Sequence, residues 1–351
     1  DHRDLHSFPT RRSSDLTNVD DLKVIGSVSA KTYRDSDKTP AEIGQELNAG
    51  TLLQGSIQKT GTGLKINVRL IDTASSENIW ANSFSGSESE RSKFQQEIIQ
   101  SIVNKTRGTL LNQSELDSLN AGDTENSEAY SLAKRGQERL EGFSRNETKE
   151  AEELFQKAIA LDPNYADAYF GLARTEFLSR LVSLKKPEDS IPSAKRYLEK
   201  ALELNPSHVE SRLHKLIIAL KQDRQTKNIS ENIDSLLSKH QNNPIVLREV
   251  AIIYLHSNQV KKAITILNQG LGLDPKNSWL HAELAIAHYL AGNLELSETH
   301  NTESLILKPY LQVSLHIRSL ILTKQNRFVE IEEQLKKAIQ NDDKNPVTMM
   351  S

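Results

Sequence analysis

The chain has 351 residues, and its 44 Lys and Arg against 47 Asp and Glu give a net charge of −3 at pH 7, which argues against a general nucleic-acid-binding protein. It contains no Cys, which excludes disulfides, thiolate zinc sites and cysteine nucleophiles. No apolar run approaches the roughly 20 residues that a membrane-spanning helix needs. The length exceeds that of one ordinary compact core, which indicates two or more domains or a repeat array.

Residues 1–16 read DHRDLHSFPTRRSSDL and contain neither hydrophobic periodicity nor the apolar segment of a signal peptide. Translated back into codons, they resemble a common short-read sequencing adapter. We therefore expect a non-native tail here, with a native disordered tail as the alternative. An adapter at this position also predicts that the coding sequence begins inside a longer gene.

Residues 17–115 show the patterns of a small α/β domain. The segment LKVIGSVSA (22–30) alternates apolar with small or polar residues, which predicts a half-buried strand. Thr39 is a suitable cap for the next helix, and Pro40 suits the first position of that helix. Further strands are predicted at 51–59, 64–72 and 77–85, followed by an amphipathic helix with Phe94, Ile98, Ile99, Ile102 and Val103 on one side.

The short sequence Gly61-Thr62-Gly63 lies between two of these strands. A phosphate-binding loop needs a longer glycine-rich segment that leads into a helix, usually with a Lys. These glycines lead into a strand instead. We therefore predict a hairpin turn.

The order strand–helix–strand–strand–strand–helix, with the segments AEIGQELNAGTLLQGSI, LKINVRLIDTASSENIWANSF and FQQEIIQSIV, resembles the TolB amino-terminal-like (FlgO-like) domain over residues 22–107. The resemblance implies a bacterial protein in which this domain precedes helical repeats, as in transcriptional regulators, nucleotide cyclases and kinases. Members of the family usually begin with one more strand and helix. Without them, the resemblance implies an exposed sheet edge or helix-packing face.

Residues 126–346 contain a repeat. Pairs that end in proline recur at intervals of 31 to 43 residues, which bracket the 34-residue tetratricopeptide unit. The best copy reads Leu247-x2-Val250-Ala251-x2-Tyr254, then Ala263-x3-Leu267, then Pro275. Small residues such as Ala173 and Ala251 allow two antiparallel helices to approach closely, and stacked pairs bury one another's apolar faces. The prolines that mark the junctions are Pro163, Pro206, Pro244, Pro275, Pro309 and Pro346.

These patterns resemble a tetratricopeptide superhelix of about six helix pairs. The predicted fold class is α+β, a small mixed α/β domain followed by an all-α tetratricopeptide superhelix (α-α solenoid). The predicted segments are the adapter-like tail (1–16), the TolB-like domain (17–115), a linker (116–125), the repeats (126–346) and a short tail (347–351).

Motifs of catalysis and metal binding are missing from the sequence. It contains no H-E-x-x-H, no Walker loop, no dinucleotide fingerprint and no G-x-S-x-G elbow. His281 and His288 lie seven residues apart, about 10 Å along a helix, which is too far for one metal ion and favours a core or groove role. In the α/β domain, Arg69, Asp72 and Glu77 are the candidates for chemistry, but strand alternation scatters them over both faces. We predict no catalytic residue, no metal and no cofactor.

A tetratricopeptide array offers a concave surface made mainly from the first helix of each pair. Trp and Arg anchor bound segments well, because they bury a large area or form forked hydrogen bonds. The alternatives are packing against the next repeat for the apolar residues and ordinary exposed surface for the others. The predicted groove residues are Phe170, Arg174, Arg248, Trp279, Tyr289 and His316.

The sequence predicts a non-enzymatic protein-interaction or sensory region of a larger bacterial regulatory protein, with a protein or peptide partner in the groove. A periplasmic envelope-assembly factor and an enzyme with its site in the α/β domain are the alternatives. The expected compartment is the periplasm if a preceding segment carries a membrane span, and the cytoplasm otherwise.

Overall fold

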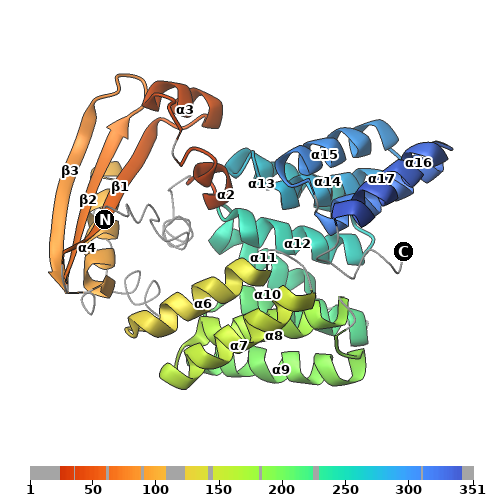
Figure 1. Ribbon diagram of the computed structural model, residues 1–351, viewed down its shortest axis with the longest axis horizontal. Coiled ribbons are helices and arrows are strands. Elements are labelled where there is room, and N and C mark those ends of the chain that lie inside the picture. The colour runs from red at the N-terminus through yellow and green to blue at the C-terminus, as the bar shows by residue number, and fades with distance from the viewer. Residues whose placement is uncertain are drawn as a thin grey trace. The chain divides into compact units, whose positions relative to one another are not determined.

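The computed structural model describes residues 24–34, 36–60, 63–87, 91–107, 123–140, 145–181, 184–223, 229–309 and 311–341 (Figure 1). The chain divides into two compact units. The first consists of Asp1–Asn120 with the short segments Lys239–Pro244 and Gly272–Lys276, and the second of the remaining residues. The adapter-like tail (1–16), most of the predicted linker (116–125), Pro346 and the tail (347–351) lie outside the described residues.

The first unit contains a three-stranded antiparallel sheet in the order β1-β2-β3. Strands β1 and β2 pair as the predicted hairpin, and Thr60 and Gly63 are the last partners before the turn. Thr39 caps α3 with a capping box that includes Glu42, and Pro40 occupies the first turn, as predicted. The elements are α2 (Ser27–Lys31), α3 (Pro40–Leu47), β1 (Thr51–Thr60), β2 (Gly63–Asp72), β3 (Asn78–Ser87) and α4 (Arg91–Arg107).

The core of this unit lies between one face of the sheet and α4, which runs along the sheet in Figure 1. Ile66 and Val68 of β2 meet the buried side of α4, where the five apolar residues predicted from the sequence are all buried. The register shifts between Leu70 and Ile71, so that both are buried. Ile79, which the shift leaves unpaired between Asn78 and Trp80, is 44% exposed. The alternation of apolar and polar residues therefore predicts which face of the sheet a side chain occupies only up to such a shift in register.

The prediction of a strand at 22–30 is wrong over the described part of that segment. Val24–Gly26 is irregular, and Ser27–Lys31 forms the short helix α2. Ser29 donates from its backbone N–H (2.8 Å) and from its hydroxyl to the carboxylate of Asp274, which belongs to the same unit. This tertiary contact outweighs the weak local preference that the alternation indicated.

The second unit is helical, and its helices follow one another in chain order from α6 to α17 (Figure 1). None of the described helices is long and apolar enough to cross a membrane. Pro244 is the first residue of α12, so here proline starts a helix where the repeat pattern placed it in a turn. The helices are α6 (Ser127–Leu140), α7 (Arg145–Leu161), α8 (Ala166–Leu181), α9 (Pro187–Leu204), α10 (Val209–Asp223), α11 (Ile229–His240), α12 (Pro244–His256), α13 (Val260–Leu273), α14 (Ser278–Leu290), α15 (Leu294–Leu307), α16 (Gln312–Lys324) and α17 (Phe328–Asn341).

Small residues hold the helices of this unit close together, as the repeat pattern requires. Ala158, Ala173, Ala251 and Ala263 are fully buried. Leu213, Val250 and Leu280 join one core that extends over α10, α12 and α14. The fold class is therefore the predicted one, α+β, with a small mixed α/β unit and an all-α array of helical repeats.

Phe155 of α7 marks the tightest of these contacts. Its ring is fully buried and faces Gly136 of α6 and Gly171 of α8. A Cβ atom at Gly171 would lie 2.2 Å from the ring, and one at Gly136 would lie 2.9 Å from it. The aromatic ring thus fills space that two glycines leave open on neighbouring helices.

We expect Gly171→Ala to lower the free energy of unfolding of the protein by about 2 kcal/mol, because the added methyl group overlaps the Phe155 ring. Urea denaturation followed by circular dichroism measures the change. Gly272→Ala is the matched control, because open space surrounds that position in α13 and alanine favours a helix. An equal response of the two variants would contradict the packing described for Phe155.

Candidate partner-binding surface

Six residues on the first helices of successive pairs form a mixed charged and aromatic cluster. Arg248 and Glu249 come from α12, and Trp279 and Glu283 come from α14. His214 of α10 and Arg174 of α8 extend the cluster through their electrostatic effects on Glu249. We call these six residues the Arg248 cluster.

Arg248 is the centre of this cluster. Its Nη2 donates a hydrogen bond to Oε1 of Glu249, and its guanidinium lies 5.5 Å from the centre of the Trp279 ring. Its Nε is buried and has no hydrogen-bond partner among the described residues. The side chain keeps 22% of its surface exposed, whereas Glu249 keeps only 7%. Arg248 is therefore held by a carboxylate and an aromatic face, in a position where most of its side chain is covered.

The two carboxyl groups of the cluster differ in charge state. Burial acts to raise the pKa of Glu249, but Arg248, His214 and Arg174 outweigh it and hold this pKa below its ordinary value. Burial raises the pKa of Glu283 to about 7, because Arg248 counteracts burial only in part and Glu249 adds to its effect. Near neutral pH, one carboxylate thus balances Arg248, while Glu283 is partly protonated.

His214 lies between Glu249 of the cluster and the aromatic rings of α8. Phe170 meets its ring edge-on with centroids 5.0 Å apart, and Phe177 lies 5.6 Å from it. Burial lowers the pKa of His214, and Arg174 and Arg248 lower it further, whereas Glu249 acts to raise it. The first helices α8, α10, α12 and α14 therefore present aromatic rings beside two arginines.

The structure brings together some of the predicted groove residues and separates others. Arg174, Arg248 and Trp279 belong to the cluster, and Phe170 adjoins it while being 8% exposed within its own core. Tyr289 packs with Ile317 and Ile321 in another core, and His316 of α16 is exposed. Their binding role stays a prediction.

Sequence reasoning missed His214, Glu249 and Glu283. Glu283 lies four residues after Trp279, so the two share one side of α14, and this spacing could have identified it. Glu249 directly follows Arg248, and neighbouring residues on a helix point about 100° apart, so nothing in the sequence indicated that they pair. That pairing depends on how α12 is rotated in the array.

The candidate residues for chemistry in the α/β unit serve the sheet and its turns. The Asp72 carboxylate accepts hydrogen bonds from the backbone N–H groups of Ser75 (2.8 Å) and Ala74 (3.0 Å), which lowers its pKa. Arg69 donates two hydrogen bonds to the side chain of Gln54 on β1. Within the described ranges, no group of three or more His, Asp or Glu is arranged to hold a metal ion.

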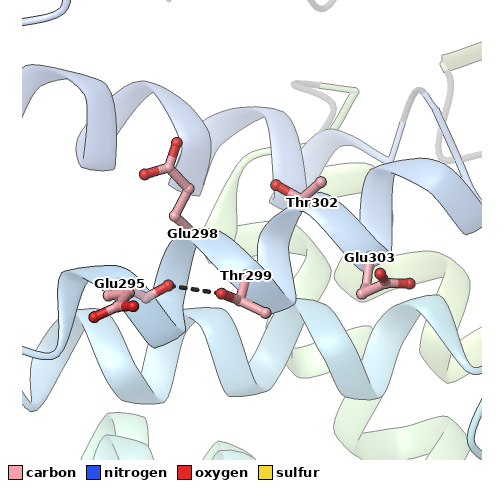
Figure 2. A pocket seen from close by; sticks show the side chains of 5 residues that line it. All are labelled: Glu295, Glu298, Thr299, Thr302 and Glu303. Atoms are coloured by element: carbon pink, nitrogen blue, oxygen red, sulfur yellow. Dashed lines mark hydrogen bonds between the residues drawn. The ribbon is translucent and has the colours of Figure 1, made fainter.

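An acidic depression on α15 is the other surface feature. Figure 2 shows Glu295, Glu298, Thr299, Thr302 and Glu303 along one helix, with the Thr299 hydroxyl donating to the backbone oxygen of Glu295 (3.0 Å). Arg327 and Gln325 already donate to the Glu298 carboxylate. All five residues come from a single helix, and such a row is ordinary for a solvated face.

Comparison with known proteins agrees with the helical array. Residues 141–175 match the sequence model of the TPR (tetratricopeptide) repeat. A protein named putative adenylate cyclase 3, from Rhizobium meliloti (strain 1021), is 26% identical over 170 residues, which cover 48% of this chain and 29% of that protein. The chain thus spans less than a third of this curated relative.

Similar solved structures show the fold alone. Human IFIT1 as a dimer with m7Gppp-AAAA is 18% identical with a TM-score of 0.51, covering 73% of this chain and 56% of that one. A monomeric IFIT1 mutant with Gppp-AAAA gives a TM-score of 0.54 at 13% identity, covering 94% of this chain and 72% of that one.

We expect Glu283→Gln to stabilise the protein at pH 8 by about 1 kcal/mol relative to wild type, a gain that shrinks towards pH 5. The folded-state pKa of Glu283 lies above the unfolded value, so its ionisation destabilises the fold increasingly as the pH rises from 4.5 to about 7. Urea denaturation midpoints at pH 5 and pH 8 measure this difference. Glu203→Gln, at a largely exposed position in α9, is the control. The same gain at both pH values would contradict the buried environment of Glu283.

Proposed function

We propose that the chain is a non-enzymatic protein-interaction region of a larger bacterial regulatory protein, and that the Arg248 cluster holds an acidic segment of the partner. The TPR repeat match supports a binding role, because repeat arrays of this kind present extended surfaces. The relative named as an adenylate cyclase supports a larger regulatory context.

The charges in the cluster are the reason for proposing an acidic partner. Glu249 offsets one of the two arginines, and Glu283 is only partly ionised near neutral pH. Lys308 adds a third cation, with its Nζ 5.9 Å from the centre of the Trp279 ring. The arginines would offer forked donors to a partner carboxylate, and an apolar partner side chain could contact Trp279.

The TolB-like domain belongs to this proposal as well. The helix–strand–strand–strand–helix part of the order behind the resemblance is present from α3 to α4 and supports the proposal, whereas the strand expected at 22–30 is absent from the described residues. The domain would connect an effector to the repeats, so that partner capture alters the assembly of the effector. Sequencing the complete gene tests this part, since an effector domain encoded in frame before residue 17 is the expected result. A complete reading frame without such a domain would overturn it.

An acidic peptide with one aromatic residue tests the binding surface directly. Because the chain has two Trp, a Trp80→Phe background isolates the emission of Trp279. We expect the peptide to change this emission, and its counterpart with Asn and Gln in place of Asp and Glu to bind at least about tenfold more weakly. Arg248→Ala should weaken binding of the acidic peptide by about tenfold or more and reduce its dependence on salt.

Arg139→Ala is the matched control. Arg139 lies on α6, pairs with Glu150 on the surface and is 51% exposed. We expect its removal to leave the affinity within about twofold of wild type. Equal affinities for the acidic and neutral peptides, or an equal loss in the two arginine variants, would overturn the proposed surface.

A further inference from the structure

Three histidine rings lie in a row between α14 and α15. His281 and His288 come from α14, and His300 comes from α15. The centroids of the His288 and His300 rings are 5.6 Å apart and the rings are nearly parallel, at 5°. His281 lies on the other side, with its Nδ1 3.2 Å from Nδ1 of His300. His300 therefore contacts both of the others, and we call the three the histidine row.

The row occupies a helix interface that contains several buried polar groups. His281 and His288 are 8% and 7% exposed. The buried hydroxyl of Ser297 donates to the backbone oxygen of Ala285, and that of Ser304 donates to the backbone oxygen of Ser278. The repeat pattern normally places apolar or small residues at these positions. Hydrogen bonds and stacked imidazoles thus replace part of the apolar contact between α14 and α15.

Such an interface depends on the charge state of its rings. The hydrogen bond between the two Nδ1 atoms needs one donor and one acceptor, so one of these nitrogens must lack a proton. Nδ1 of His288 is buried and has no hydrogen-bond partner among the described residues. A second proton in the row would place two cations about 5.5 Å apart in a partly buried site.

We propose that the histidine row is a proton-responsive joint, which holds α14 and α15 together while its rings are neutral and loosens this pair in weak acid. The joint is separate from the partner-binding role proposed above and does not depend on it.

The surrounding charges do not favour a protonated row. Burial, followed by His281 and His288, lowers the pKa of His300 to about 4, and burial lowers that of His288. Glu298 of α15 is held by Arg327, and Glu283 of α14 lies in the field of Arg248. No carboxylate contributes to the shift of His300 among the described residues. The other charged or titratable residues on these and the neighbouring helices are Tyr289 of α14, Glu295 and Glu303 of α15, His316, Arg318 and Lys324 of α16, Glu249, Tyr254 and His256 of α12, and Lys261 and Lys262 of α13.

The direction of the effect follows from the two states of the chain. An unfolded histidine has a pKa of about 6.5, and that of His300 in the folded protein is lower. The stability that the neutral ring provides is therefore complete above pH 6.5 and is lost as the pH falls towards 4. From pH 7.5 to 5, protonation of His300 in the unfolded chain should raise the unfolding equilibrium constant by about tenfold or more.

His300→Phe keeps an aromatic ring in the row and removes the titration. Urea denaturation of the full chain at pH 7.5 and pH 5 compares it with wild type. We expect the unfolding equilibrium constant of wild type to rise about tenfold more over this interval than that of the variant. His316→Gln, at an exposed position on α16, is the matched control and should behave as wild type does. Equal pH dependence in wild type and His300→Phe would overturn the proposal.

Two measurements on wild type cover the case in which His300→Phe does not fold. Nuclear magnetic resonance titration of the ten histidines should show at least one imidazole that stays neutral at pH 5. Amide hydrogen exchange, corrected for its intrinsic pH dependence, should show that α14 and α15 open more at pH 5 than α6 and α7 do. Titration of every imidazole near 6.5, or equal protection of the two helix pairs at pH 5, would exclude the joint.

Discussion

The helical array depends on mutual burial, because no helix pair can hide its apolar faces alone. Small residues at the crossings set how closely the helices approach, and a larger side chain from the neighbouring helix fills the remaining space. The contact of Phe155 with Gly136 and Gly171 shows this relation across three helices. Helix α8 contributes Leu172 to the core around Phe155 and Ala173 to the next core along the array. The position of a first helix is therefore set by its packing against the repeats on both sides.

This packing also determines which polar groups come together. Arg248 meets Trp279 because α12 and α14 share one core, in which Val250 and Leu280 are fully buried. A rigid core of this kind fixes the charged side chains above it at little further entropic cost. The Arg248 cluster is therefore preorganised, because Glu249 and the face of the Trp279 ring both hold the guanidinium of Arg248.

The sequence predicted most of the fold and about half of the cluster. Periodicity identified the buried side of α4 and the small residues of the repeats, because each of these signals lies within one element. The prediction of a strand at 22–30 failed because the conformation of Ser29 depends on Asp274, which lies 245 residues away. Glu249 and His300 escaped notice for a related reason: their partners come from the rotation and spacing of whole helices, which no local pattern specifies.

Helices α14 and α15 carry two proton-sensitive groups, Glu283 and His300, whose effects on stability oppose each other. Lowering the pH neutralises the buried Glu283 and so stabilises the fold, whereas it protonates His300 in the unfolded chain and so destabilises the fold. The two windows overlap between about pH 4.5 and 6.5, so the stability of the wild-type protein changes less with pH there than either group alone would cause. A flat profile in this range would therefore reflect compensation between two neighbouring helices, and only variants that remove one group at a time separate the two contributions.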